Sequence, residues 1–276
     1  MPNLDPSTAA SIIEANINAY LLSFARLPGA VRHDDSQSAW VDSGAADETF
    51  NSVVRARFSP ESVDEGIEAV LSHFRSRSAP FTWHVGPGTE PADLGRFLLA
   101  HGLTHSEDEP GMAIDLERVR ETAAPLELTI ETVRDERGLE EWVAVWLFPV
   151  PDDLRRDLLA PLRQRGVGDD LPWRYYIGRV DDRPVATSEL FVADGVAAVH
   201  YVVTLPGLRR RGIGAAMTLH VLGEAGALGC RLAVLTSSPD GIGIYRRLGF
   251  QEYCTFRRYI WSPNAPHPPP LGASLG

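Results

Sequence analysis

Apolar positions in the first part of the chain alternate between helical and strand spacing. In residues 6–26 they recur every three or four positions, which is typical of an amphipathic helix. Runs with a period of two follow and indicate strands. The pattern predicts a helix over 6–26, strands over 30–34, 38–42 and 50–58, a helix over 59–77, a strand over 81–85, a short helix over 91–101, and a terminal hairpin over 104–116 broken at Pro110-Gly111.

The second part of the chain repeats this order of elements. The closing signatures also match, since Leu99-Ala-His-Gly-Leu103 corresponds to Arg246-Arg-Leu-Gly-Phe250. A repeated order of this kind indicates duplication of one α/β module. The pattern predicts a strand over 126–133, helices over 138–148 and 152–165, strands over 173–180, 184–193 and 196–203, a helix over 212–227, a strand over 231–236, a helix over 241–248, and a final strand over 251–261.

The repeat and the breaks in it predict two domains. Residues 1–118 form the first domain and 126–261 the second, joined by a charged, small-residue and proline-containing linker over 119–125. Residues 262–276 are rich in proline and are predicted to be an unstructured tail. A chain of 276 residues is long enough for two cores of ordinary size.

Composition and charge exclude several classes of partner and site. A net charge of -11 argues against nucleic acid or an anionic membrane as the main partner. The amino terminus lacks a signal-peptide pattern and no apolar run reaches membrane-spanning length, so a cytoplasmic protein is expected. Cys230 and Cys254 cannot build a disulfide framework. The histidines and cysteines show no metal-ligand spacing, so no metal is expected.

A glycine-containing turn in the second half carries the candidate chemistry. Gly212 and Gly214 stand where the predicted strand ending near Thr204 passes into a helix, next to Arg209-Arg-Arg211. Converging N–H groups, a helix amino terminus and guanidinium groups suit a diphosphate. A dinucleotide fingerprint would need a small residue at Met217, and a P-loop would need lysine, which this chain lacks. The alternative is a turn that binds nothing.

Two segments resemble the GNAT superfamily of acetyltransferases. They are Thr204-Leu-Pro-x-x-Arg-x-Arg-Gly-Ile-Gly-Ala-Ala216 and Ala233-Val-Leu-Thr-Ser-Ser-Pro-Asp-Gly-Ile-Gly-Ile-Tyr-Arg-Arg-Leu-Gly-Phe250. The resemblance implies an α/β fold of two GNAT-like modules, each a mixed, mainly antiparallel sheet flanked by helices. In the first module Phe58-Ser-Pro-Glu-Ser62 replaces the glycine loop, so that copy is expected to be degenerate and not to bind coenzyme A.

The same resemblance implies positions for an acetyl-CoA cosubstrate. Tyr245 takes the place of the family's general acid, which would protonate the departing thiolate. At the position where many members carry asparagine, this chain has Ser238, which leaves a hydroxyl for the pantetheine. The other positions are Val202, Val203 and Thr204 for the pantetheine, Arg209, Arg210, Arg211, Gly212, Ile213, Gly214, Ala215 and Ala216 for the pyrophosphate, and Gly241 near Tyr245.

The acceptor amine must lose a proton before it attacks the thioester. Glu189, acting through water, and His200, acting directly, are candidate bases, although each could instead be a paired strand residue. We therefore expect direct transfer of acetyl from acetyl-CoA to a primary amine, either on a small molecule or at a peptide amino terminus. The alternatives are a non-catalytic acyl-CoA-binding or interaction protein, and an enzyme that uses a larger acyl-CoA.

Overall fold

The computed structural model describes residues 5–120 and 127–263. They fall into two compact units that we call unit 1 and unit 2. Unit 1 contains the residues up to Tyr20 together with Pro110–Cys254, and unit 2 contains Leu21–Glu109 together with the residues from Thr255 onward.

This division differs from the predicted domains 1–118 and 126–261. The helix up to Tyr20 comes from the first half of the chain but belongs to unit 1. A strand of the first half continues past Pro110 into unit 1, and a strand of the second half continues past Cys254 into unit 2. Residues 121–125 of the predicted linker and 264–276 of the predicted tail lie outside the described residues. Within those that are described, no helix combines the length and apolar character needed to cross a bilayer.

The sheet of unit 1 has the strand order β5–β10–β9–β8–β7–β6. Neighbouring strands are antiparallel except for the parallel pair β9 and β10. Residues 185–191 of β8 are all buried, as expected for a strand covered on both faces. The strands are β5 (Thr104–Asp115, with Gly111–Asp115 paired to β10), β6 (Leu128–Thr132), β7 (Trp173–Val180), β8 (Arg183–Ala193), β9 (Val196–Thr204) and β10 (Leu232–Thr236).

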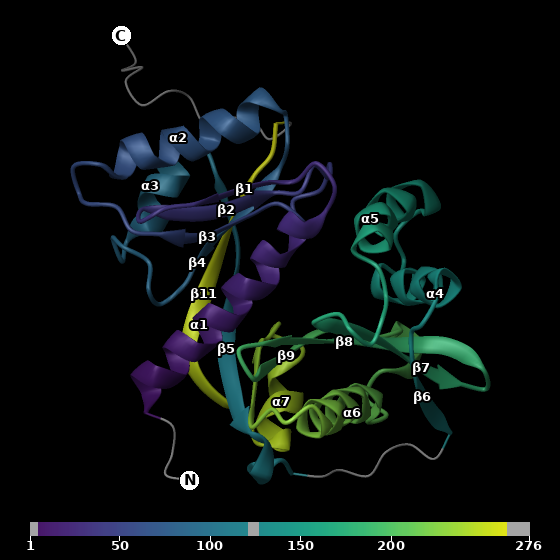
Figure 1. The fold of residues 1–276 in the computed structure, drawn as a ribbon. Coiled ribbons are helices and arrows are strands. Elements are labelled where there is room, and N and C mark those ends of the chain that lie inside the picture. The colour runs from purple at the N-terminus through teal and green to yellow at the C-terminus, as the bar shows by residue number, and fades with distance from the viewer. Residues whose placement is uncertain (1–4, 121–126, 264–276) are drawn as a thin grey trace. The chain divides into compact units, whose positions relative to one another are not determined.

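Helices cover both faces of this sheet (Figure 1). Helices α4 and α5 lie on one side of β7, β8 and β9, and α6 lies on the other. Helix α6 packs its apolar side chains against the sheet around Met217 and Val221, which are fully buried. The helices of unit 1 are α1 (Pro6–Leu22, through Tyr20), α4 (Glu136–Trp146), α5 (Asp152–Arg165), α6 (Ile213–Ala227) and α7 (Ile242–Leu248).

Unit 2 has a smaller sheet of the same type. Its order is β1–β2–β3–β4–β11, and only the pair β3 and β4 is parallel. Its core contains Phe74, Phe81 and Trp83, all fully buried. The elements are η1 (Ser23–Arg26), β1 (Val31–Asp34), β2 (Ser38–Asp42), β3 (Ser52–Ala56), α2 (Val63–Ser76), β4 (Phe81–Val85), α3 (Leu94–Ala100) and β11 (Gln251–Trp261, with Arg257–Trp261 paired to β4).

The predicted hairpin over 104–116 is wrong, because this segment is one continuous strand, β5. Proline lacks only the N–H donor, and the carbonyl of Pro110 remains in the ladder, where it accepts a hydrogen bond of 3.0 Å from the Ser237 N–H. The first half of the chain thus supplies the end of β5 to unit 1. The second half in turn supplies the end of β11 to unit 2.

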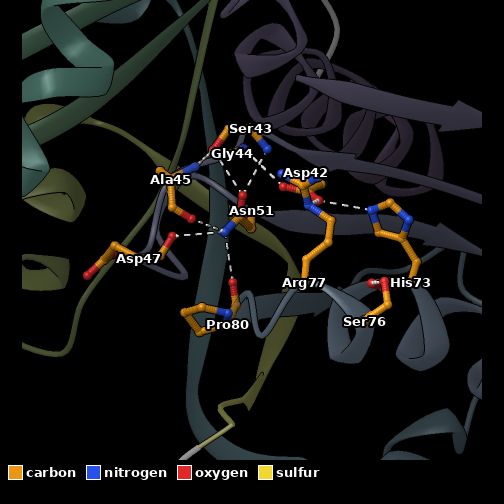
Figure 2. Close-up of polar contacts among 10 residues, drawn as sticks. All are labelled: Asp42, Ser43, Gly44, Ala45, Asp47, Asn51, His73, Ser76, Arg77 and Pro80. Atoms are coloured by element: carbon orange, nitrogen blue, oxygen red, sulfur yellow. Dashed lines mark hydrogen bonds and ion pairs between the residues drawn. The ribbon is translucent and has the colours of Figure 1, made fainter. Parts of the chain in front are cut away.

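Buried polar side chains fix the loop between β2 and β3 in unit 2 (Figure 2). The Asp42 carboxylate is fully buried and lies 2.9 Å from His73 Nε2 and 2.6 Å from Arg77 Nε. Beside it, the Asn51 amide donates to the carbonyl oxygens of Ala45, Asp47 and Pro80. Because every one of these polar groups has a partner, the network acts as a structural support for unit 2.

Candidate functional site

Strand β9 separates from β10 halfway along its length. The described residues pair the two strands only from Val196 to Ala198, whereas β9 continues along β8 as far as Thr204. Strand β10 meanwhile stays paired with β5 up to Thr236. Residues 199–204 therefore present an edge of backbone N–H and C=O groups toward the side that β10 has left. An edge of this kind can pair with an extended chain that carries amides.

A β-bulge lies within this open edge, beyond the last residue of β9 that pairs with β10. The β8–β9 register shifts between Thr187 and Glu189, and Tyr201 adopts a left-handed conformation with φ of 49°. Bulges bend a strand and increase its twist. The Tyr201 carbonyl accepts a hydrogen bond of 2.9 Å from Thr187 Oγ1, and the Trp142 indole donates to the Ser188 carbonyl over 3.1 Å. These bonds satisfy carbonyl groups at the bulge.

The glycine loop follows directly on the open edge. After the turn η3 (Pro206–Leu208), Arg210 and Gly212 both have positive φ, 66° and 84°, and α6 begins at Ile213. Glycine tolerates this conformation without strain. The first-turn N–H groups of α6 have no acceptor within the helix, and they carry the positive end of its dipole. The loop therefore has the geometry of an anion site.

The three predicted arginines are all exposed, but they have different partners. Arg209 Nε donates to the Thr204 carbonyl over 3.1 Å, which ties the loop to the end of β9. Arg211 forms an ion pair with Glu127. Arg209 and Arg210 are therefore better placed than Arg211 to supply charge to a phosphate.

The predicted cosubstrate positions converge at the amino terminus of α6. A Cβ atom placed on Gly214 would lie 3.4 Å from Ile244 Cδ1, 3.8 Å from Thr204 Oγ1 and 3.9 Å from Val202 Cγ1. The end of β9, the glycine loop and helix α7 are thus within van der Waals distance of one another. Val202, Val203 and Thr204 are all half-buried.

Tyr245 lies on α7, next to Ile244. Its side chain is 9% exposed and packs edge-on against Phe250. Its hydroxyl makes no hydrogen bond with the described residues, and burial raises its pKa to about 12. A Cβ atom on Gly241 would lie only 2.9 Å from the Tyr245 ring, so glycine at this position allows the ring its close approach. The hydroxyl stays protonated at neutral pH and is able to donate a proton.

Ser238 is exposed, and its hydroxyl is engaged locally. Ser238 Oγ accepts a bond of 3.3 Å from the Gly241 N–H, and the Ser238 carbonyl accepts from the N–H groups of Gly241 and Ile242. Ser238 therefore stabilises the turn that leads into α7. Any contact of its hydroxyl with a pantetheine would compete with this bond.

The two candidate bases lie together, on the face covered by α4 and α5. Glu189 and His200 stand opposite each other in the β8–β9 register. Glu189 is fully buried and accepts bonds of 2.8 Å from Arg165 Nη1 and 3.1 Å from the Tyr20 hydroxyl. The Tyr20 ring stacks on His200, with centroids 3.8 Å apart.

Neither of these side chains is a strong, accessible base. Burial raises the pKa of the Glu189 carboxyl although Arg165 opposes the shift, and Arg165 already occupies one carboxylate oxygen. Burial, reinforced by the positive charge of Arg165, lowers the pKa of His200 to about 3. A base works best when its pKa lies near the operating pH. The structure therefore favours the paired-strand alternative for both residues.

The partners of Glu189 could not be predicted from the sequence. Arg165 is fully buried, with its guanidinium 4.0 Å from the Trp173 ring centroid, and its Nη1 donates to the Tyr175 hydroxyl over 3.1 Å. Tyr20 comes from α1, 169 residues away from Glu189. A buried arginine at a helix end is invisible in a hydropathy pattern, and nothing in the sequence brings α1 to this sheet.

In unit 2 the corresponding edge is covered by backbone. Strands β3 and β4 are paired at Ser52 and Val53. Past that point the Glu90 N–H donates to the Ala56 carbonyl, and the Glu90 carbonyl accepts from the Phe58 N–H, each over 2.9 Å. The chain itself thus makes the hydrogen bonds that an extended ligand would need at this edge.

The open edge of β9 and the glycine turn before α6 lie within a region that matches a protein-family model. The model of the Acetyltransferase (GNAT) family matches residues 137–250. The chain contains a GNAT domain. The matched region ends at Phe250, between α7 and β11 and just before the part of the chain that contributes to unit 2. Among curated proteins, none matches the sequence.

Solved structures share the fold over nearly the whole chain. A GCN5-related N-acetyltransferase from Kribbella flavida is 24% identical, with a TM-score of 0.72, and the match covers 93% of this chain and 96% of that one. A GCN5-related N-acetyltransferase from Sphaerobacter thermophilus is 19% identical, with a TM-score of 0.58 and coverage of 94% and 93%. The predicted α/β fold class, with mainly antiparallel sheets flanked by helices, is confirmed.

A tandem GNAT protein from the clavulanic acid biosynthesis pathway also matches. It is 15% identical, with a TM-score of 0.57, and the match covers 94% of this chain and 96% of that one. At these identities the likeness concerns the fold. A chain with two GNAT-like units is therefore an arrangement known from another protein.

Proposed function

We propose that the GNAT domain transfers an acetyl group from acetyl-CoA directly to a primary amine. The separation of β9 from β10 beside the glycine loop carries this proposal. Residues 199–204 offer backbone partners for the amides of pantetheine, and the amino terminus of α6 offers N–H groups for the pyrophosphate. Arg209 and Arg210 supply positive charge to the phosphates.

Tyr245 is proposed as the general acid. The neutral amine nitrogen attacks the thioester carbonyl carbon, and the C–S bond breaks as the C–N bond forms. The nitrogen releases one proton to solvent, and the departing thiolate takes the proton of the Tyr245 hydroxyl. Because the thiol, with a pKa of about 8.5, is a stronger acid than Tyr245, this transfer is uphill by itself. The hydroxyl contributes by donating to the sulfur as negative charge develops there in the transition state. Solvent then restores the proton to the tyrosine.

The proton of the acceptor ammonium is proposed to leave to solvent. Glu189 is committed to Arg165 and Tyr20, and the low pKa of His200 makes it a weak acceptor. Only the neutral fraction of the amine then reacts. The rate at subsaturating amine is expected to rise with pH up to the amine pKa, and the Tyr245 hydroxyl, with a pKa of about 12, stays protonated over this range.

Unit 2 is proposed to be a degenerate copy that binds no coenzyme A. The Glu90 backbone holds its strand edge closed, as the hydrogen bonds to Ala56 and Phe58 show. Where unit 1 has the glycine loop, this copy has Ser59-Pro-Glu-Ser62, which includes a residue without an N–H and a negative charge. One acetyl-CoA per chain is therefore expected.

Calorimetric titration of acetyl-CoA into the purified protein tests the proposal. A stoichiometry of one per chain, followed by thiol release with a panel of primary amines, would support it. Binding without thiol release from any amine would instead support the non-catalytic acyl-CoA-binding protein. No binding by folded protein would contradict both readings.

Replacing Tyr245 by phenylalanine is expected to lower kcat about a hundredfold, because the departing thiolate loses its proton donor. The Kd for acetyl-CoA should stay within about twofold of wild type, since the ring remains packed on Phe250. Steady-state thiol release and calorimetry measure the two quantities. Tyr253→Phe is the matched control, because that hydroxyl donates to Gln251 over 2.9 Å at an exposed position on β11, outside α7. An unchanged kcat in Tyr245→Phe would contradict the acid role.

A further inference from the structure

Helix α1 is the first element of the chain, yet through Tyr20 it belongs to unit 1. The Asn16 amide donates to the Val196 carbonyl over 2.9 Å, at the start of β9. One turn later Tyr20 is 3% exposed and contacts both β8 and β9. Helix α1 is thus held against β9, the strand whose far end forms the proposed acyl-CoA edge.

The Tyr20 hydroxyl completes a buried ion pair. Arg165 and Glu189 are both fully buried; Arg165 Nη1 donates to Glu189 Oε1, and the Tyr20 hydroxyl donates to Glu189 Oε2. A buried ion pair is stable only when hydrogen bonds satisfy its remaining polar atoms. The ring also lies 5.0 Å from the guanidinium carbon of Arg165. The position of Tyr20 is therefore fixed by groups from α5 and β8.

The Tyr20 ring packs against residues at the bulge of β9. It stacks on His200 at 3.8 Å with 22° between the ring planes, and it meets the Tyr201 ring edge-on at 6.4 Å. His200 is the last residue of β9 paired with β8 before the register shifts, and Tyr201 lies within the shift. A left-handed conformation at a residue such as Tyr201 costs of order 1 kcal/mol and persists only when its surroundings hold it.

We propose that Tyr20 is a positioning residue of the acyl-CoA site, through which helix α1 fixes the β9 bulge and so the open edge of residues 199–204. This inference rests on the proposed function for its link to acyl-CoA, but its structural part does not. Tyr20 contacts the His200 and Tyr201 rings at the bulge, and Thr187 Oγ1 donates to the Tyr201 carbonyl. Without the stack, the edge is free to relax toward a regular ladder.

The test compares Tyr20→Leu with Tyr176→Leu. Tyr176 is a fully buried tyrosine of the same unit that packs with Met217 on the opposite face, so its replacement controls for the loss of a large side chain. Two readouts are used, namely hydrogen exchange of the amides of residues 199–204 in the ligand-free protein and the calorimetric Kd for acetyl-CoA. In Tyr20→Leu both are expected to rise about tenfold or more relative to Tyr176→Leu.

Tyr20→Phe is the conservative variant. It keeps the stack on His200 and loses the bond to Glu189, so its exchange rates and Kd should rise clearly less than those of Tyr20→Leu. Equal exchange of residues 199–204 in Tyr20→Leu and Tyr176→Leu would overturn the positioning role. Faster exchange with an unchanged Kd would overturn its link to acyl-CoA.

Two further results distinguish failure of the Tyr20 proposal from failure of the proposed function and from misfolding of a variant. If wild type binds no acetyl-CoA, the proposed function fails, while the exchange comparison still decides the role of Tyr20. If Tyr20→Leu does not fold, His200→Ala removes the other half of the stack and leaves the ion pair intact. His200→Ala is then expected to show the same increase in exchange, and exchange as slow as in wild type would overturn the proposal.

Discussion

Gly214→Asp is expected to weaken acetyl-CoA binding more than a hundredfold while leaving the fold intact. A Cβ atom at this position meets only ordinary contacts, the nearest at 3.4 Å from Ile244 Cδ1, so the fold can accommodate a side chain. The added carboxylate would stand in the first turn of α6, where the phosphates are proposed to bind. Two unit charges about 5 Å apart at an effective dielectric constant of about 20 repel by about 3 kcal/mol.

Gly214→Asn is the matched control, because it has nearly the same shape without the charge. Calorimetry with acetyl-CoA should show at most about a tenfold loss for this variant, compared with more than a hundredfold for Gly214→Asp. The thermal unfolding midpoints of the two variants should be similar, since aspartate at a helix amino terminus is favourable. Equal losses of binding in both variants would point to a steric effect and against a phosphate at this helix end.

Arg165→Met is expected to lower the free energy of unfolding by about 3–5 kcal/mol. The substitution leaves the Glu189 carboxylate fully buried without its cation, and removing one partner of a buried ion pair has this cost. Urea unfolding followed by circular dichroism measures the change. Arg163→Met is the control: it removes an arginine two residues earlier whose pairs with Glu136 and Glu140 lie at the surface, so its effect should stay below about 1 kcal/mol.

The loss in Arg165→Met should also depend on pH. Burial already raises the pKa of Glu189, and removing Arg165 raises it further. A carboxyl whose pKa is higher in the folded than in the unfolded protein binds more protons when folded, so stability falls as pH rises between the two values. The variant should therefore be more stable at pH 5 than at pH 8, relative to wild type. A second substitution, Glu189→Met, should restore most of the lost stability, and failure to do so would contradict the ion-pair account.

The local geometry of the proposed acyl-CoA site could be predicted from the sequence. Gly212 and Gly214 next to three arginines, between a strand and a helix, indicated an anion site, and the structure places the turn, the end of β9 and α7 together. Such features are encoded over short stretches, because turn geometry and helix ends depend mainly on neighbouring residues. The resemblance to GNAT proteins added Tyr245 and Ser238. Their catalytic and binding roles remain predictions.

The surroundings of Glu189 and His200 could not be predicted in the same way. Their β-strand alternation was visible, but the arginine and the tyrosine that surround them come from α5 and α1. The hydropathy pattern predicts an apolar face for each helix, but it does not predict which sheet that face packs against. The pKa of His200 follows from burial and from the charge of Arg165, and both are properties of the assembled unit.

The sequence by itself determined the order of helices and strands, the repetition of one α/β pattern, and the glycine turn. These depend on the spacing of apolar residues and on local backbone preferences. Only the tertiary structure decided that β5 and β11 each contribute to the unit formed by the other half, that α1 packs on β9, and that β9 separates from β10 after Ala198. A strand with a given alternation can pair with many others, and the choice among them is made by packing across the whole unit.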